Sequence, residues 1–437
     1  MRNTPIDAEL VARKIKESDL ASLDNASIRE IVRLVNQIEK ETGEKYVRME
    51  MGVPGLPSPL VGIEAEKAAL DDGVSSIYPN IEGLPQLKEE TSRFIKLFLN
   101  VDVRPAGCVP TVGSLMGGMV SFLVVNRNNR KREGTLFIDP GFPVQKQQVK
   151  ILGHDYRSFD IYNYRGKKLR PKLESYLKTG KVSSILYSNP NNPSWICFSD
   201  EELKIIGELA TEYDVIVIED LAYFGMDFRN HYGIPGKPPY QPTVAHYCDN
   251  YLLLISSSKA FSYAGQRVGM LVISDSLYGR RYPDLLRYYT SDNFGHAMVF
   301  GALYALSAGV THSAQYGLQA MLKAVNEGEY NYIEDVKEYG ERARMMKQMF
   351  IANGFKIVYD TDIDRPIADG FYFTISYPGM SSGELLEKLL YYGISAITLN
   401  ITGSEKKGGL RACVSLVSRN MFPVLEKRLQ RFYEDFK

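Results

Sequence analysis

Short apolar segments that alternate with helical stretches constrain the fold of this chain more than any other feature. These segments cover residues 108–112, 135–138, 182–187, 215–218 and 251–255. Strands that are apolar throughout are buried on both faces, which is typical of parallel strands covered by helices. The sequence therefore predicts an α/β fold, with a large domain built on a mostly parallel, doubly wound sheet.

One connection does not fit a parallel sheet. The next apolar strand, residues 268–273, follows residues 251–255 too closely for a parallel crossover, which needs about a dozen residues or more and normally a helix. We therefore expect strand 268–273 to run antiparallel to its neighbour. This would return Arg267 to the edge of the sheet that carries Lys259.

The remaining segments predict a smaller domain and an arm. Residues 1–60 are expected to form an N-terminal arm, 61–312 the large domain, and 313–437 a long connecting helix followed by a smaller α+β domain on which the arm packs. Within the arm, apolar residues recur at helical spacing over 27–42, and Ser27 with Glu30 forms a capping box.

Charge and composition exclude several classes of function. Fifty-two basic and 52 acidic residues give zero formal net charge, so no overall field attracts nucleic acid or an anionic membrane. The N-terminal residues contain no apolar signal-peptide core, and no window reaches the roughly 18 consecutive apolar residues of a membrane helix. We expect a small-molecule partner.

Cysteines and histidines do not suggest a metal site. The four cysteines lie far apart, without CxxC spacing, which argues against a zinc cluster and a disulfide framework. The five histidines show no HxxxH or HExxH grouping. We expect reduced thiols in a cytoplasmic protein.

Polar clusters follow the apolar segments directly. They are Gly113-Ser114-Leu115, the turn ending at Phe142, residues 188–194, residues 219–223 and residues 256–269. Ligands of doubly wound sheets bind outside the carboxyl ends of the strands. The clusters are therefore expected to converge on one crevice.

Lys259 is the most unusual residue in these clusters. It lies just past the end of an apolar strand, and burying an ammonium costs several kcal/mol unless it is paired or neutralised. A lysine that loses its proton is a nucleophile towards aldehydes, and a Schiff base with pyridoxal phosphate is its common use. The alternative is a surface lysine at a strand end.

The other clusters supply what this cofactor requires. Its phosphate suits the backbone N–H groups of Gly113, Ser114 and Leu115 at a helix start, together with Ser256 and Arg267. The alternative for this turn is an ordinary strand-to-helix connection.

The cofactor's ring needs a buried carboxylate to keep its pyridine nitrogen protonated. Asp220 is the candidate and Glu219 the competitor, because side chains alternate along a strand and only one can face the crevice. Asn192 and Tyr223 suit the phenolic oxygen, and Phe142 offers a face for stacking on the ring.

These motifs resemble those of class I/II aminotransferases of fold type I, in order from about residue 50 to 420. SNPNNPS resembles NPxNPTG, DLAY resembles DxAY, SSSKAFSYAGQRVG resembles SxxKxxxxxGxRxG, and GVPGLPSP resembles GxPxFxxP. Tyr78 with Gly83 resembles the family's Y(x)4G element, and Arg411 stands at the position of the arginine that binds the substrate carboxylate.

The resemblance implies roles for these residues. Lys259, Asp220 and Tyr223 would be catalytic, and the large domain 61–312 would bind the cofactor. Arg411, the Gly52 backbone and Asn192 would bind the substrate. Tyr78 would reach the phosphate in a neighbouring subunit, which implies a homodimer with shared active sites.

The sequence also departs from the family pattern. Ser194-Trp195 stands where the family usually has Thr-Gly, and Phe142 replaces the commoner Tyr or Trp. Arg287 carries no motif, so a residue for a substrate side-chain carboxylate is not identified.

The predicted function is transfer of an amino group from an L-amino acid to a 2-oxo acid by a pyridoxal phosphate-dependent aminotransferase. A C–S lyase or decarboxylase of the same fold is the main alternative, because these enzymes carry the same cofactor motifs. A non-catalytic cofactor-binding module would need a basic helix-turn-helix extension, whereas the residues before Gly52 are mixed in charge. The donor, the acceptor and the pathway are not identified by the sequence.

Overall fold

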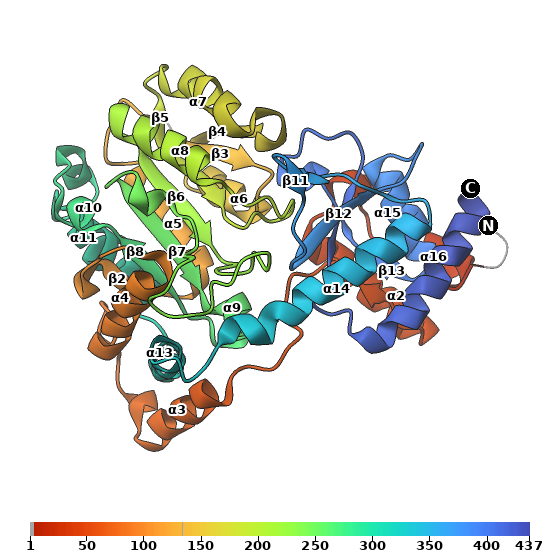
Figure 1. Cartoon of the computed structure of the whole chain (residues 1–437), viewed down its shortest axis with the longest axis horizontal. Helices are drawn as coiled ribbons and strands as arrows, with labels where there is room; N and C mark the ends of the chain where they lie inside the picture. Colours follow the sequence, from red (N-terminus) through yellow and green to blue (C-terminus); the bar gives the residue numbers. More distant parts are fainter. Residues whose placement is uncertain (1–3, 133) are drawn as a thin grey trace.

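A seven-stranded sheet forms the centre of the larger of two lobes (Figure 1). The computed structural model describes residues 4–132 and 134–437. In spatial order the strands are β2 (Cys108–Thr111), β8 (Gly269–Ile273), β7 (Tyr251–Ser256), β6 (Ile216–Leu221), β5 (Val182–Ser188), β3 (Gly134–Asp139) and β4 (Asp155–Asp160). The predicted α/β class with a mostly parallel sheet is confirmed.

Strand β8 is the antiparallel member of this sheet. It pairs antiparallel with β7 and with β2, whereas β4, β3, β5, β6 and β7 pair in parallel. The prediction from the short connection after β7 is confirmed. Ser256 lies opposite Gly269, so Arg267 returns to the edge at which β7 ends.

Strand β4 is the strand that the sequence pattern did not predict. It lies at the edge of the sheet, and its first four side chains alternate between exposed and partly buried. An edge strand needs no continuous apolar run, because one side faces water. A search for wholly apolar segments therefore passes over it.

Helices cover the sheet and extend the larger lobe. The helices that connect the strands are α5 (Gly113–Val125), α6 (Pro143–Ile151), α7 (Leu169–Leu177) and α8 (Asp200–Glu212). Helix α5 contacts β6, β7 and β8. Helix α13 (His312–Asn326) packs against α3 (Leu60–Asp71) and α4 (Pro85–Leu99) beside the sheet (Figure 1).

The smaller lobe contains a second, antiparallel sheet. Its strands, in spatial order, are β14 (Ile397–Thr398), β15 (Leu410–Cys413), β12 (Tyr372–Ser376) and β9 (Lys356–Ile357). Helices α15 (Ser382–Tyr391) and α16 (Phe422–Phe436) belong to the same lobe (Figure 1).

The N-terminal segment packs on this smaller lobe. Strand β1 (Val47–Arg48) pairs with β13 (Ile394–Ser395), and the Ile6 amide donates to the carbonyl of Tyr391. Helix α1 (Ala8–Glu17) precedes α2 (Ile28–Thr42), which begins at the predicted capping box. The prediction of a helix over 27–42 is confirmed.

The helical stretch expected after residue 312 is two helices rather than one. Helix α13 ends at Asn326, and α14 (Tyr332–Ala352) begins after a short break and runs from the larger lobe into the smaller one (Figure 1). Gly328 has a φ of 75°, which an α-helix cannot contain, and the Asn331 side chain caps α14.

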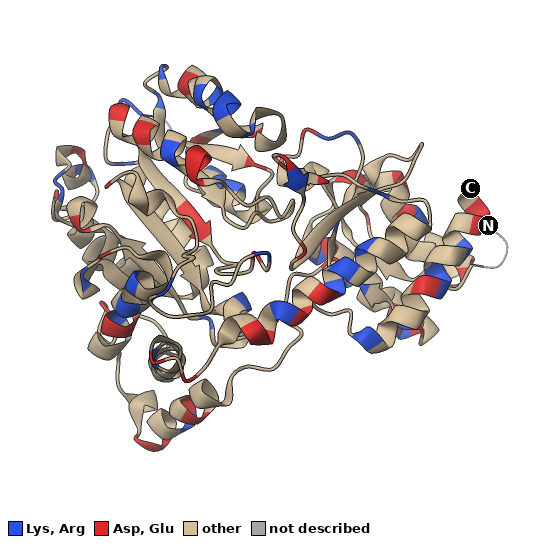
Figure 2. Ribbon diagram, in the orientation of Figure 1, with Lys and Arg blue, Asp and Glu red and all other residues tan. Residues whose placement is uncertain are grey.

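Charged side chains of both signs are interspersed over the two lobes (Figure 2). Within the described residues, no helix combines the length and the apolar character needed to cross a membrane.

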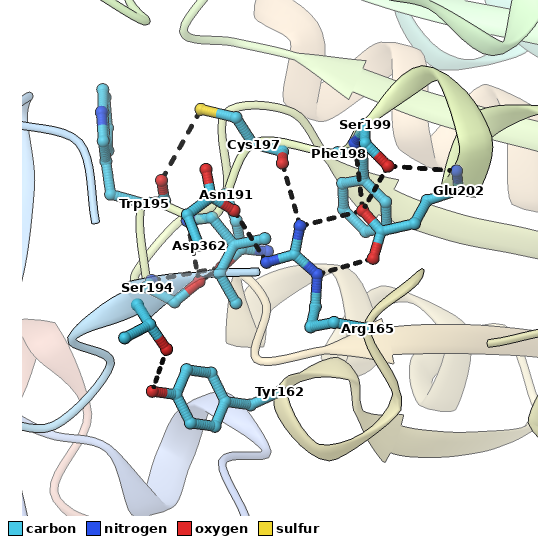
Figure 3. Close-up of polar contacts among 12 residues, drawn as sticks. Tyr162, Arg165, Asn191, Ser194, Trp195, Cys197, Phe198, Ser199, Glu202 and Asp362 are labelled. Atoms are coloured by element: carbon cyan, nitrogen blue, oxygen red, sulfur yellow. Dashed lines mark hydrogen bonds and ion pairs between the residues drawn. The ribbon is translucent and has the colours of Figure 1, made fainter. Parts of the chain in front are cut away.

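An ion-pair cluster joins the lobes on the side away from α14. Asp362 ends strand β10 (Thr361–Asp362), which forms a hairpin with β11 (Arg365–Pro366). Its carboxylate accepts from Arg165 and from Arg229 of the larger lobe, each at 2.8 Å. Arg165 also pairs with Glu202 at 2.7 Å (Figure 3). Asp362 is buried, so it holds two arginines in an environment with little water.

We expect Asp362→Asn to lower the free energy of unfolding by about 2 kcal/mol, because two charge-assisted hydrogen bonds inside the protein are weakened, while Arg165 keeps Glu202 and Arg229 keeps Asp227 as partners. The matched control is Glu64→Gln, whose pair with Lys67 is exposed on both sides and should contribute less than about 0.5 kcal/mol. Urea unfolding of the two variants measures the difference. Equal stability of Asp362→Asn and the wild type would contradict the expectation.

Candidate active site

The candidate site lies where strands of the larger sheet end. Ser188, Asp220 and Leu254 are aligned across β5, β6 and β7, so the polar residues that follow these strands share one edge. The irregular segment after Glu50 reaches the same place from the arm, since the Lys259 Nζ donates a hydrogen bond to the Gly52 carbonyl. The structure therefore brings together residues far apart in the sequence.

Lys259 lies in a single helical turn, α9 (Ser257–Ala260), directly after β7. Its ammonium is partly buried and lies 5.4 Å from the centre of the Phe371 ring. No carboxylate of the described residues forms an ion pair with it. Burial lowers the pKa of Lys259 to about 8, and the positive charges of Arg411 and Arg267 act in the same direction, while Cys413 opposes them. Near neutral pH its amine therefore gives up its proton far more readily than an ordinary lysine.

Asp220 is a buried carboxyl that forms no ion pair with any residue the structure describes. It is 6% exposed, and its two oxygens accept from Gln145 Nε2 at 2.7 Å and from the Ala222 amide at 3.1 Å. Burial raises the pKa of Asp220 to about 6, against the effect of these hydrogen bonds. Gln145 lies in α6 and was missed by the sequence analysis.

Glu219 faces a different environment, as the alternation along β6 requires. Its carboxylate accepts from Thr243 Oγ1 at 2.5 Å and from the Val244 amide at 3.2 Å. These partners lie in the segment before β7 and not at the crevice. Of the two carboxyls, Asp220 is therefore the one that is hydrogen bonded to α6.

The first turn of α5 and the nearby Arg267 guanidinium form a region of positive electrostatic potential, called the cradle below. Its N-cap, Val112, provides no side-chain hydrogen bond, and Ser114 and Leu115 follow Gly113 in the first turn. Gly113 has a φ of 68°, and a Cβ there would lie 2.5 Å from Arg267 Nη2. Only glycine lets the guanidinium approach this turn so closely.

Ser256 and Arg267 complete the edge around this cradle. Ser256 is buried, and its hydroxyl accepts from the Ser258 amide at 3.2 Å. The Arg267 Nη1 donates to the Ala264 carbonyl at 2.9 Å and leaves Nη2 beside Gly113.

Arg411 is a guanidinium buried without a carboxylate. It lies on β15, is 1% exposed, and donates to the Glu50 carbonyl at 2.6 Å and to Asn192 Oδ1 at 3.4 Å. Its Nε has no hydrogen-bond partner in the described part of the chain, and none of the described ion pairs includes it. The guanidinium lies 4.5 Å from the centre of the Tyr372 ring.

Tyr223 and Tyr372 meet beside Arg411. Their hydroxyls are hydrogen bonded at 2.8 Å, Tyr223 from the turn after β6 and Tyr372 from β12 of the smaller lobe. Burial raises the pKa of Tyr372 to about 12, while Arg411 acts in the opposite direction. A Cβ at Gly52 would overlap the Tyr372 hydroxyl, so this tyrosine also limits the residue at position 52.

Tyr372 was missed by the sequence analysis, which assigned its segment only to a strand. A useful signal would have been a hydroxyl-bearing residue in a strand next to the one that carries Arg411.

Two predicted site residues lie apart from these contacts. Tyr78 is 89% exposed, at the surface of the chain. Phe142 is partly buried at the N-cap of α6, whose Gln145 contacts Asp220.

The turn after β5 is tightly bonded within itself. Asn191 Nδ2 donates to the Pro140 carbonyl at 2.8 Å, and Asn191 Oδ1 accepts from the Ser194 hydroxyl at 2.6 Å. The next residue, Trp195, has a φ of 63° and is fully buried. The departure from the family pattern thus lies in a left-handed backbone position, which favours glycine.

Comparison with known proteins agrees with this arrangement. The sequence profile of the family "Aminotransferase class I and II" matches residues 45–429. A probable aspartate aminotransferase of Methanocaldococcus jannaschii is 27% identical over 350 residues, 80% of each chain. An LL-diaminopimelate aminotransferase of Aquifex aeolicus is 26% identical over 393 residues, 89% of this chain and 92% of the relative.

Solved structures share the fold. An alanine aminotransferase from Pyrococcus furiosus superposes with a TM-score of 0.75 at 20% identity, covering 95% of this chain and 98% of the other. The predicted family, the enzyme class and the cofactor are confirmed together. The chain belongs to the class I and II aminotransferases, which transfer amino groups with pyridoxal phosphate.

Proposed function

We propose that this protein moves the amino group of an L-amino acid to a 2-oxo acid in the crevice around Lys259, which would hold the cofactor covalently. The observation that carries the proposal is the state of Lys259: a partly buried amine with a lowered pKa, two arginines nearby and no described carboxylate paired with it. Such an amine is a nucleophile and a base near neutral pH.

Asp220 fits the cofactor's ring. A buried carboxyl with a raised pKa and no cationic partner is stabilised by a protonated pyridine nitrogen, which supplies the missing positive charge. Gln145 would hold the Asp220 carboxylate in one orientation by its hydrogen bond at 2.7 Å.

The start of α5 fits the cofactor's phosphate. Its first-turn N–H groups have no side-chain cap, and Arg267 Nη2 lies beside Gly113. A dianion there would accept from the backbone, from Arg267 and from the Ser256 hydroxyl.

Arg411 fits the substrate carboxylate. Its buried guanidinium has an unused Nε and no described acidic partner. Asn192 and the Gly52 segment lie next to it. A carboxylate placed there would form a bidentate pair, which fixes the substrate's Cα relative to Lys259.

Proton transfer in this proposal is the work of Lys259. Pyridoxal phosphate supplies a ring that takes up the electron pair released at the substrate Cα. The Nζ of Lys259, freed when the substrate amine takes its place, would accept the Cα proton and deliver it to the cofactor carbon C4′, on the other side of the amino nitrogen. Asp220 would hold the proton on the ring nitrogen, and Tyr223 and Asn192 would donate to the phenolic oxygen.

The substrate class is proposed from Arg411 and from the relatives. Their names specify aspartate, LL-diaminopimelate and alanine, all of which carry an α-carboxylate. Arg287 is exposed and is not assigned to a substrate side chain. We propose a role in amino-acid biosynthesis.

A cytoplasmic homodimer is the proposed form. Leu60, Ile77 and Tyr78 expose 73%, 58% and 89% of their surface on neighbouring segments, and exposed apolar groups mark interaction sites. In the family that this chain resembles, the tyrosine at this position reaches the partner's phosphate. All four cysteines are free thiols, in keeping with a reducing compartment.

The first test adds single amino acids to the cofactor-loaded protein without any 2-oxo acid. We expect the visible absorption of the bound cofactor to bleach with some L-amino acids, and not with amines that lack the carboxylate for Arg411. Lys259→Ala should reduce turnover by at least about 10³-fold while the fold is kept. The control is exposed Lys67→Ala.

Release of ammonia or carbon dioxide without an acceptor would replace the transferase by a lyase or a decarboxylase. Full activity of Lys259→Ala would end the mechanism.

The second test follows the rate at which cofactor-free protein attaches pyridoxal phosphate covalently as the pH is varied. Only the neutral Nζ reacts, so the rate should rise through about pH 8, where an ordinary lysine would still be protonated. Arg411→Gln removes one positive neighbour and should move this midpoint upward. A rate that keeps rising beyond pH 10 in the wild type would contradict the lowered pKa.

The third test concerns shared sites. Lys259→Ala and Tyr78→Ala are each expected to be nearly inactive. Co-expressed, they should recover about a quarter of the wild-type activity, because half of the random dimers contain one intact site. Each variant expressed alone is the control, and no recovery in a proven mixed dimer would refute shared sites.

A further inference from the structure

Trp195 occupies a backbone conformation that bulky residues rarely adopt. Its φ is 63°, within the left-handed region, and it is the one tryptophan of the chain. Such a conformation persists only where the surroundings hold it, and it marks positions with a function more often than ordinary loops.

The surroundings of Trp195 hold it firmly on the backbone side. Its amide donates to the Asn191 carbonyl at 2.9 Å, and its carbonyl accepts from the Cys197 thiol at 3.7 Å. The Cys197 carbonyl in turn accepts from Arg165 at 3.1 Å, within the ion-pair cluster of Asp362. Figure 3 shows the bonds of Cys197 to Trp195 and to Arg165, with the indole of Trp195 directed away from Arg165.

The indole packs against the two tyrosines of the candidate site. Its ring centre lies 5.3 Å from that of Tyr223 and 6.1 Å from that of Tyr372, and both pairs meet edge to face. A Cβ at Gly370 would overlap the indole, so Trp195 also lies directly on the backbone that leads into β12. Trp195 is thus in contact with both lobes where their tyrosines meet.

The indole makes these contacts through its surface and not through a hydrogen bond. Its Nε1 has no hydrogen-bond partner in the part of the chain that the structure describes. Trp195 is therefore placed to restrict the positions of Tyr223 and Tyr372 by packing.

The tyrosine pair gives this packing a chemical consequence. The proposed role of Tyr223 is to donate to the cofactor's phenolic oxygen. A hydroxyl that donates can still accept, so the Tyr372 hydroxyl can then donate to the Tyr223 oxygen at the same 2.8 Å separation. A donor that itself accepts a hydrogen bond becomes a stronger donor.

We propose that Trp195 is a positioning residue that holds the Tyr372 hydroxyl against Tyr223, and so sets the strength of the hydrogen bond that Tyr223 gives to the cofactor. The inference rests on the proposed function, because it assigns Tyr223 to that oxygen. A side chain that only filled space would not affect the cofactor's acid-base behaviour.

The first measurement is the tryptophan emission of cofactor-free wild type during titration with pyridoxal phosphate. Trp195 is the sole source of this emission, and the cofactor absorbs where tryptophan emits. We expect most of the emission to be quenched on binding, with Trp195→Phe as the control for tyrosine emission. Tight binding without quenching would contradict the location of the site, and with it the proposed function.

The second measurement is the pH midpoint of the bound cofactor's colour change. Tyr372→Phe weakens Tyr223 as a donor, so the phenolic anion is less stabilised, the proton is held more tightly and the midpoint rises by about 0.5 to 1 pH unit. Trp195→Gly should raise the midpoint in the same direction, and Trp195→Phe, which retains an aromatic ring, should raise it less.

The double variant Trp195→Gly with Tyr372→Phe tests whether Trp195 acts through the Tyr372 hydroxyl. If Trp195 acts through the Tyr372 hydroxyl, the double variant has the midpoint of Tyr372→Phe alone. Additive shifts, or an unchanged midpoint in Trp195→Gly, would overturn the inference while quenching still supports the site. Phe432→Leu, in the core of the smaller lobe, controls for general destabilisation. If Trp195→Gly does not fold, Trp195→Leu takes its place in the same cycle.

Discussion

The unpaired charge of Lys259 is the constraint on which the rest of the site depends. A partly buried ammonium beside two arginines is unfavourable, and the crevice supplies no described carboxylate to offset it. Asp220 and Arg411 repeat the pattern: among the described residues, the first is a carboxyl that lacks a cationic partner and the second a guanidinium that lacks an acidic one. Groups that could neutralise each other are kept apart, which leaves each of them available for a ligand of opposite charge.

Local patterns predicted most of the fold, and the exceptions have physical causes. The buried strands were recognisable because burial on both faces removes polar alternation, and the length of one connection gave the direction of β8. Strand β4 was not predicted because an edge strand can carry polar residues. The break between α13 and α14 depends on Gly328, a single residue inside a continuous helical periodicity.

The predicted part of the site consists of residues next to strand ends, whose meeting follows from the parallel sheet. Lys259, Asp220 and Asn192 belong to this group. Gln145 and Tyr372 could not be found in the same way, because one comes from a helix face and the other from a separate sheet. Their contacts depend on how distant segments pack. From the sequence, Trp195 could be recognised only as a departure from the family pattern, because its structural role depends on its backbone φ and on the rings that it contacts.

The Asp362 hairpin has a mechanical consequence for the crevice. Besides other contacts, the smaller lobe is joined to the larger one along α14 (Figure 1) and, at a separate place, through the carboxylate that lies between Arg165 and Arg229. A body attached at two separated points cannot swing about one while the other stays closed. Widening the crevice on the hairpin side therefore requires Asp362 to leave both arginines, and because these charges are largely buried, dissolved salt screens them little and should leave the opening rate nearly independent of ionic strength.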